Sequence, residues 1–77
     1  MKELLEFIAK SMVDNPDAVV VTEKTNENSN AVTLELAVGE GDVGKVIGKQ
    51  GRIAKAIRTV VSAAAVSENK KYYVEIL

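Results

Sequence analysis

The stretch VIGKQGRIAKAI, residues 46–57, places two glycines between two apolar segments, and the interpretation of the whole chain starts from it. Only two residues separate Gly48 from Gly51. Such a short junction between two helices is unusual, because consecutive helices normally need a connection that redirects the chain. Without a Cβ, a glycine adopts positive φ and lets another group approach the main chain. Gly51 also precedes a long helix predicted over residues 52–66, whose free N–H groups and positive dipole end suit an anion. This stretch therefore predicts a loop that holds a phosphate or a sugar.

Basic side chains concentrate around the same loop. Residues 43–58 contain five basic side chains and no acidic one, whereas residues 1–42 contain three basic and nine acidic ones. The net charge of −1 therefore describes a chain with one strongly positive patch on an otherwise acidic surface. Such a patch favours contact with a nucleic-acid backbone. Its members are Lys45, Lys49, Arg52, Lys55 and Arg58.

Hydrophobic periodicity predicts the other elements. Apolar side chains three and four positions apart indicate a helix, and alternation of apolar with other residues indicates a half-buried strand. These patterns predict the order α-β-β-α-α-β in one domain over residues 1–77, without repeats or linkers. The predicted elements are helices over 1–13, 43–47 and 52–66 and strands over 18–25, 31–38 and 71–77, with a polar hairpin loop over 26–30.

Individual residues refine two of these elements. Asp42 is expected to be the N-cap of the short helix, and Gly48 is expected to end it. In the last strand, either Tyr73, or Tyr72 together with Val74, is expected to face inward. Phe7, Tyr72 and Tyr73 are candidates for stacking on bases, but we expect these three aromatic side chains to pack in the core or at an edge.

Composition excludes most enzyme chemistry. The 77 residues include no Cys and no His, which rules out the usual zinc sites, disulfide frameworks and histidine-based catalytic groups. We therefore predict no metal, no cofactor and no enzymatic activity. The N-terminal segment carries Glu3 and Glu6, unlike a secretory signal, and no stretch approaches the length of a membrane span. A cytoplasmic protein without membrane contact is expected.

Residues Val46–Ile57, together with the element order, closely resemble the signature of the type II KH domain. The resemblance covers essentially the whole chain and, at this length, is to the KhpA family of minimal bacterial KH proteins. It implies an α+β fold in which a three-stranded sheet packs against helices on one face. KH domains clamp about four single-stranded nucleotides with a GXXG loop.

Carried over residue by residue, the resemblance assigns the RNA-binding site. The clamp would be Gly48, Lys49, Gln50 and Gly51, with Lys45, Arg52 and Lys55 along the RNA and Ile47 in an apolar groove floor with Val43 and Ile53. Val46 and Ile47 cannot both face that groove, and the sequence does not distinguish them. The family further implies an RNA chaperone that associates with itself and with a KhpB-type KH partner, with a link to cell elongation, cell shape and cell-wall homeostasis.

Two other functions are alternatives to RNA binding. Gly39, Gly41 and Gly44 fit the spacing of a nucleotide-binding loop, but a P-loop needs Ser or Thr after Lys45, where the chain has Val46. The acidic residue that a dinucleotide site needs at the end of the next strand is also missing. The second alternative is a protein-interaction module that keeps the KH scaffold without binding RNA.

The long helix also predicts self-association. At 100° per residue, one apolar strip is expected to form its core face, namely Ile53, Ile57, Val60 and Ala64. A second strip widens the apolar arc to roughly half the circumference, more than one sheet contact requires. We predict that this second strip forms a homodimer interface with Val61 at its centre, the alternative being that it packs under the N-terminal helix. Its residues are Ala54, Val61 and Ala65.

Overall fold

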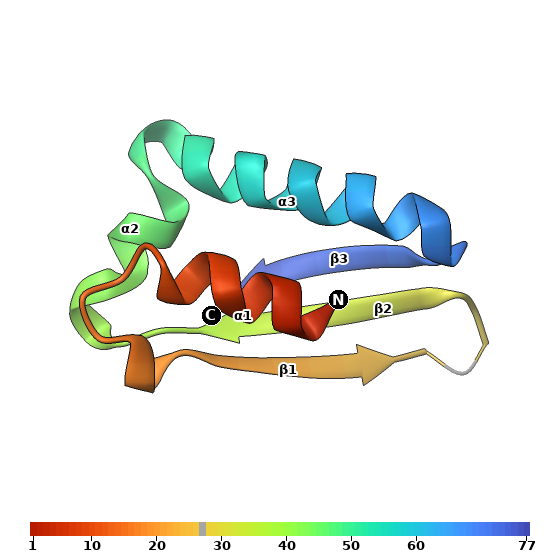
Figure 1. Ribbon diagram of the computed structural model, residues 1–77, viewed down its shortest axis with the longest axis horizontal. Coiled ribbons are helices and arrows are strands. Elements are labelled where there is room, and N and C mark those ends of the chain that lie inside the picture. The colour runs from red at the N-terminus through yellow and green to blue at the C-terminus, as the bar shows by residue number, and fades with distance from the viewer. Residues whose placement is uncertain (27) are drawn as a thin grey trace.

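A three-stranded sheet with helices on one face makes up the computed structural model, which describes residues 1–26 and 28–77 (Figure 1). Residue 27, in the predicted hairpin loop, lies outside the described residues. The predicted order α-β-β-α-α-β is confirmed, with short 3-10 turns between some elements. The helices are α1 (Lys2–Lys10), α2 (Val43–Ile47) and α3 (Arg52–Ala65), and the strands are β1 (Val20–Thr25), β2 (Ala31–Ala37) and β3 (Lys71–Ile76).

The sheet has the order β1-β2-β3, with β1 antiparallel and β3 parallel to the central strand β2. On β2, the alternate residues Val32, Leu34 and Leu36 are buried beneath the helices, while their neighbours are only partly covered. On β3, Val74 is buried and Tyr73 is 54% exposed. Tyr72 with Val74, rather than Tyr73, therefore faces inward, and helices cover one face of the sheet as predicted.

Two boundaries differ from the predicted ones by more than one residue, for local reasons. The first helix ends at Lys10 rather than at residue 13, and the Ser11 hydroxyl donates a hydrogen bond of 2.7 Å to the Phe7 carbonyl there. The first strand begins at Val20, because Pro16 starts a 3-10 turn that extends to Ala18. Proline fits the first position of such a turn because its φ is fixed and its missing N–H is not needed there.

The face of α3 that packs on the sheet is only partly the predicted one, because Ile57 of the predicted core stripe is buried there together with residues of the second strip. Val61 is fully buried, with Ala54 and Ala65 buried on the same stripe, whereas Val60 of the predicted core stripe is 47% exposed. Alanines on the inward face let the helix lie close to the sheet. The prediction that Ala54, Val61 and Ala65 form a dimer interface is therefore wrong, because all three side chains lie inside the subunit.

Candidate nucleic-acid interface

The GXXG loop, Gly48–Gly51, has a backbone that few residue types adopt easily. Gly48 has a φ of 76°, Gln50 a φ of 58° and Gly51 a φ of 74°, all in the region that favours glycine. The N–H of Gly51 donates to the Gly48 carbonyl at 3.2 Å, which closes the loop on itself. The glycines predicted from the sequence are thus required by local conformation.

The two glycines serve different purposes. A Cβ on Gly48 would lie 2.3 Å from the Ile53 side chain and 2.9 Å from the Ile53 backbone nitrogen. Gly48 therefore lets the loop pack against the first turn of α3. A Cβ on Gly51 would meet no atom within 4 Å, so the main chain at Gly51 is open to an approaching group. The space that a side chain would need is thus filled by Ile53 at Gly48 and empty at Gly51, and the approach of nucleic acid to the two glycines stays a prediction.

The N-terminus of α3 lies beside this open backbone. Gly51 is its N-cap, no side chain caps the helix there, and its first turn contains no acidic residue. The N–H of Arg52, the first residue of this 14-residue helix, donates to the Lys49 carbonyl. The N–H groups that follow in the first turn have no intrahelical acceptor and carry the positive end of the helix dipole. This end of α3 can therefore accept an anionic group such as a phosphate.

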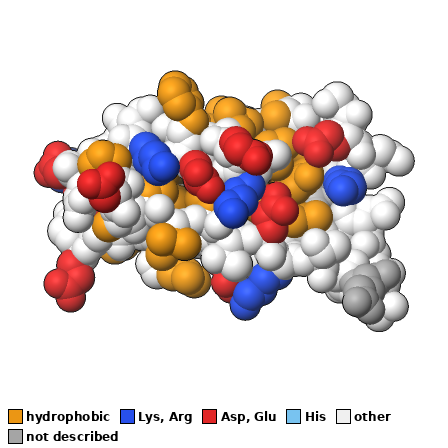
Figure 2. Space-filling view, turned by 60° about the horizontal axis from the view of Figure 1, so that its bottom comes forward, with side chains coloured by type: hydrophobic (Ala, Val, Ile, Leu, Met, Phe, Trp, Pro, Cys, Tyr) orange, Lys and Arg blue, Asp and Glu red, His pale blue; other side chains and the backbone are white. Residues whose placement is uncertain are grey.

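Exposed cations surround the loop. Arg52 directly follows Gly51, Lys49 lies two positions before it, and Lys55 follows one turn along α3; all three are exposed. None of them takes part in an ion pair among the described residues. The face that carries α1 and β1 differs, because acidic and basic side chains are interspersed there (Figure 2). The geometry thus leaves these three charges available to a ligand.

Lys45 differs from the other cations of the patch. Its ammonium contacts the Asp14 carboxylate and lies 3.1 Å from Asp42 Oδ1. The hydrogen bond to Asp14 is the largest cause that raises the Lys45 pKa above its usual value, and the bond to Asp42 raises it further. Much of its charge is therefore already compensated, and a contact between Lys45 and RNA stays a prediction.

Asp42 has a different role from the predicted one. It precedes α2 as expected, but its buried carboxylate makes no capping bond to that helix. Instead it accepts hydrogen bonds from the backbone N–H groups of Asp14, at 3.2 Å, and Asn15, at 3.1 Å. The bond from Asp14 is the largest cause that lowers the Asp42 pKa. Asp42 thus fixes the segment after α1 to the start of α2. The pairing of Asp14 with Lys45 joins residues 31 positions apart, and no sequence pattern indicates it.

Val46 and Ile47, the two candidates for the groove floor, differ in exposure. Val46 is fully buried in the core, whereas Ile47 is 37% exposed at the end of α2, directly before the loop. Val43 and Ile53 are partly buried. Ile47 is therefore the member of the pair that a ligand can reach, and its contact with RNA stays a prediction.

An apolar groove that the sequence did not reveal lies between α1 and α3. It has a volume of about 390 Å³ and only apolar lining residues. Phe7, at its rim on α1, is 71% exposed, an unusual position for a large aromatic side chain. The groove is lined by Leu4, Phe7, Ile8 and Met12 of α1 and by Ile53, Ala56, Ile57 and Val60 of α3.

Neither a metal site nor a membrane helix is found in the described part of the chain. Across residues 1–26 and 28–77, no three His, Cys, Asp or Glu side chains come together in a way that could hold a metal ion. No helix within those ranges is long and apolar enough to cross a membrane.

Comparison with known proteins gives close relatives over the full length. Residues 2–76 match the family described as KhpA/KhpB, KH domain. The chain is 66% identical to RNA-binding protein KhpA of Clostridium acetobutylicum and 65% identical to that of Clostridium perfringens, in each case over 100% of both chains. RNA-binding protein KhpA of Caldanaerobacter subterraneus is 57% identical, again over both whole chains.

Among solved structures, the similarity is to Era. A crystal structure of Era with MgGDPNP and nucleotides 1506–1542 of 16S ribosomal RNA superposes with a TM-score of 0.66 at 19% identity. The alignment covers 97% of this chain and 28% of the Era chain. A structure of Aquifex aeolicus Era gives the same values. At this identity the likeness concerns the fold alone, and it agrees with an α+β KH domain.

Proposed function

The chain belongs to the KhpA/KhpB KH-domain family, and from this premise we propose that it binds single-stranded RNA at the GXXG loop. One observation carries the proposal: the main chain at Gly51 is open, and it lies directly before the uncapped N-terminus of α3. Lys49 and Arg52 on either side supply charge for the flanking phosphates. The family is a non-enzymatic one, in agreement with the predicted lack of catalytic activity.

The family also supports a more specific role. Contacts made through backbone N–H groups and lysines read phosphates rather than bases, so binding is expected to be weak and tolerant of sequence. Those properties suit an RNA chaperone, which must bind and release many RNAs. We propose that the chain acts in this way with a KhpB-type KH partner, in a process linked to cell elongation and cell-wall homeostasis.

Self-association is part of the proposal, on a different surface from the predicted one. A second copy of the chain is the occupant that we assign to the apolar groove. Phe7 and the groove belong to the same patch, so a two-fold pair can place each Phe7 against the groove of the other subunit. The lining is entirely apolar, and a domain of 77 residues gains stability from burying it. A KhpB-type domain would compete for the same surface.

The loop assignment is tested with Gly51→Asp. Aspartate tolerates the left-handed backbone better than most residues, and the new side chain meets no neighbour, so the fold should survive. Its carboxylate repels phosphate at the open position, and affinity for single-stranded RNA should fall at least tenfold. Wild-type binding should be roughly micromolar. With about three phosphate contacts, the slope of log K against log salt should be about −2.

Gly41→Asp is the matched control. A Cβ at Gly41 also meets no atom within 4 Å, and the substitution adds the same charge outside the loop. Its RNA affinity should stay within about twofold of wild type by fluorescence anisotropy. Unchanged affinity in a Gly51→Asp protein with a native circular dichroism spectrum would reject the loop as the binding site. A wild-type protein that binds no single-stranded RNA would favour the protein-interaction module instead.

A further inference from the structure

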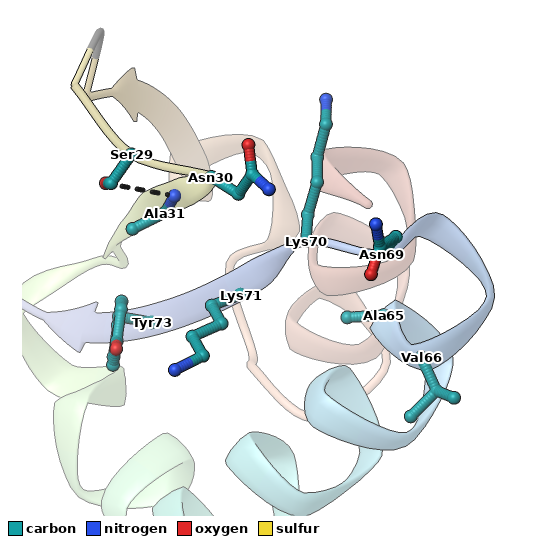
Figure 3. Close-up of a pocket in the computed structure, with 9 residues that line it drawn as sticks. All are labelled: Ser29, Asn30, Ala31, Ala65, Val66, Asn69, Lys70, Lys71 and Tyr73. Atoms are coloured by element: carbon teal, nitrogen blue, oxygen red, sulfur yellow. Dashed lines mark hydrogen bonds between the residues drawn. The ribbon is translucent and has the colours of Figure 1, made fainter.

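A pocket of about 520 Å³ lies at the opposite end of α3 from the GXXG loop (Figure 3). Three segments form this distal pocket: the start of β2, the end of α3, and the turn that leads into β3. Most of its side chains are polar, and two of them are lysines. The lining residues are Ser29, Asn30, Ala31, Ala65, Val66, Asn69, Lys70, Lys71 and Tyr73.

The side of α3 that faces β3 lies between the loop and the distal pocket. A second hollow, of about 360 Å³, shares four residues with the distal pocket and adds Ser62 and Tyr72, so it lies between α3 and β3. Next along α3, Arg58 Nε donates a hydrogen bond of 3.3 Å to the Val74 carbonyl of β3. Lys55, Arg58 and Ser62 are three and four positions apart, and therefore share one side of the helix. We call these three residues the β3 flank of α3.

The distance along this flank suits a longer RNA than the loop alone would hold. From Arg52 at the loop to Ala65 at the distal pocket, α3 rises by about 20 Å at 1.5 Å per residue. The GXXG loop of a KH domain clamps about four nucleotides. A strand that leaves the loop along the β3 flank would therefore reach the pocket with nucleotides beyond that set.

The distal pocket offers both types of contact that single-stranded RNA uses. Lys71 and Tyr73 are two positions apart on β3 and extend to the face of the sheet away from the helices, whereas Lys70 extends the other way (Figure 3). Because β3 is an edge strand, RNA that follows the β3 flank can reach Lys71 and Tyr73 by crossing the exposed edge of β3. Tyr73 is 54% exposed, so its ring is accessible to a base. Neither lysine takes part in an ion pair within residues 1–26 and 28–77. Stacking on an aromatic ring beside cations is the usual chemistry of single-stranded nucleic-acid sites.

We propose that the RNA strand held at the GXXG loop continues along the β3 flank, and that the distal pocket binds a further base on Tyr73 and further phosphates at Lys70 and Lys71. This inference rests on the proposed RNA binding at the loop. It makes the footprint of one subunit longer than the four nucleotides of the loop.

The test compares two lengths of RNA with two pairs of substitutions. Oligouridylates of about four and ten nucleotides are titrated into wild type and into a Lys70→Gln, Lys71→Gln double variant. The variant should lose about tenfold in affinity for the longer RNA. Its slope of log K against log salt should be less steep by about 1.4, because two phosphate contacts are lost and each contributes about 0.7. Its affinity for the shorter RNA should be unchanged. Because each comparison uses one RNA length, the larger number of binding registers on the longer RNA cancels.

A Lys2→Gln, Lys10→Gln double variant is the matched control. It removes the same charge from α1 and should bind both RNAs like wild type. Tyr73→Ser should weaken only the longer RNA, by about fivefold or more. RNA binding at the distal pocket is rejected if wild type binds RNA but the Lys70→Gln, Lys71→Gln variant binds both RNAs as wild type does, or loses affinity equally for both. It is also rejected if this variant loses no more affinity than the α1 control. Failure of wild type to bind either RNA would instead reject the proposed function on which the pocket depends.

Discussion

The two sides of α3 that flank its buried face differ in chemistry. Toward α1, Ile53, Ala56 and Val60 line an apolar groove that contains no charged side chain. Toward β3, the β3 flank carries Lys55, Arg58 and Ser62 and leads from the GXXG loop to the distal pocket. One helix thus keeps a surface suited to another protein apart from a surface suited to RNA. Because the two sides share only the buried stripe between them, a substitution on one side should weaken one activity and leave the other intact.

The largest effect is expected at that buried stripe. Val61→Asp places an unpaired carboxylate in the core, where Val61 is fully buried, and such burial costs about 4 kcal/mol or more. That cost is comparable with the whole stability of a domain of this size. The variant should be largely unfolded in thermal melts followed by circular dichroism, and both RNA binding and self-association should be lost. A native-like melting transition would show that α3 does not pack by this face.

The next effect separates the two sides. Val60→Asp adds a charge to the apolar groove at a half-exposed position, so stability should change by only about 0.5 kcal/mol. Self-association should weaken at least tenfold in sedimentation equilibrium, about 1.4 kcal/mol, because an unpaired carboxylate would be buried between subunits. RNA affinity per subunit should be retained.

Ser62→Asp is the matched change on the β3 flank. It adds the same charge two positions away, and it should weaken binding of long RNA while leaving self-association intact. If wild type is a monomer at high micromolar concentration, or if Val60→Asp associates as wild type does, the apolar groove is not the interface. Equal effects of both substitutions on both activities would contradict the separation of the two sides.

The smallest effect concerns Asp42, which lies on neither side of α3 and pairs with Lys45. Its pKa is below the ordinary value of 3.8, so its contribution to stability is complete above that pH and is lost as the pH falls through the lower, folded-state value. Asp42→Asn should reduce stability at neutral pH and remove this part of the acid dependence. Urea titrations between about pH 2 and pH 7 would check it. Parallel pH profiles for the two proteins would show that Asp42 contributes nothing to the acid transition.

Much of the fold and of the loop was predictable because the signals are local. Alternation along β2 identifies a half-buried strand without knowledge of its neighbours, and the spacing of Gly48 and Gly51 indicates a backbone that other residues rarely adopt. The cluster of cations around the loop is likewise visible as a run of residues. The apolar groove was not predictable, because its lining comes from two segments far apart in the chain, within residues 4–12 and 53–60.

Sequence patterns therefore established the order of elements, the KH resemblance and the position of the loop. Tertiary packing alone determined which residues of the two apolar strips on α3 meet the sheet, since both strips have helical spacing and only the shape of the sheet surface distinguishes them. Packing also fills the space beside Gly48 with Ile53 and brings Asp14 to Lys45, 31 positions away. These outcomes depend on contacts between segments far apart in the chain, and hydrophobic periodicity carries no information about such contacts.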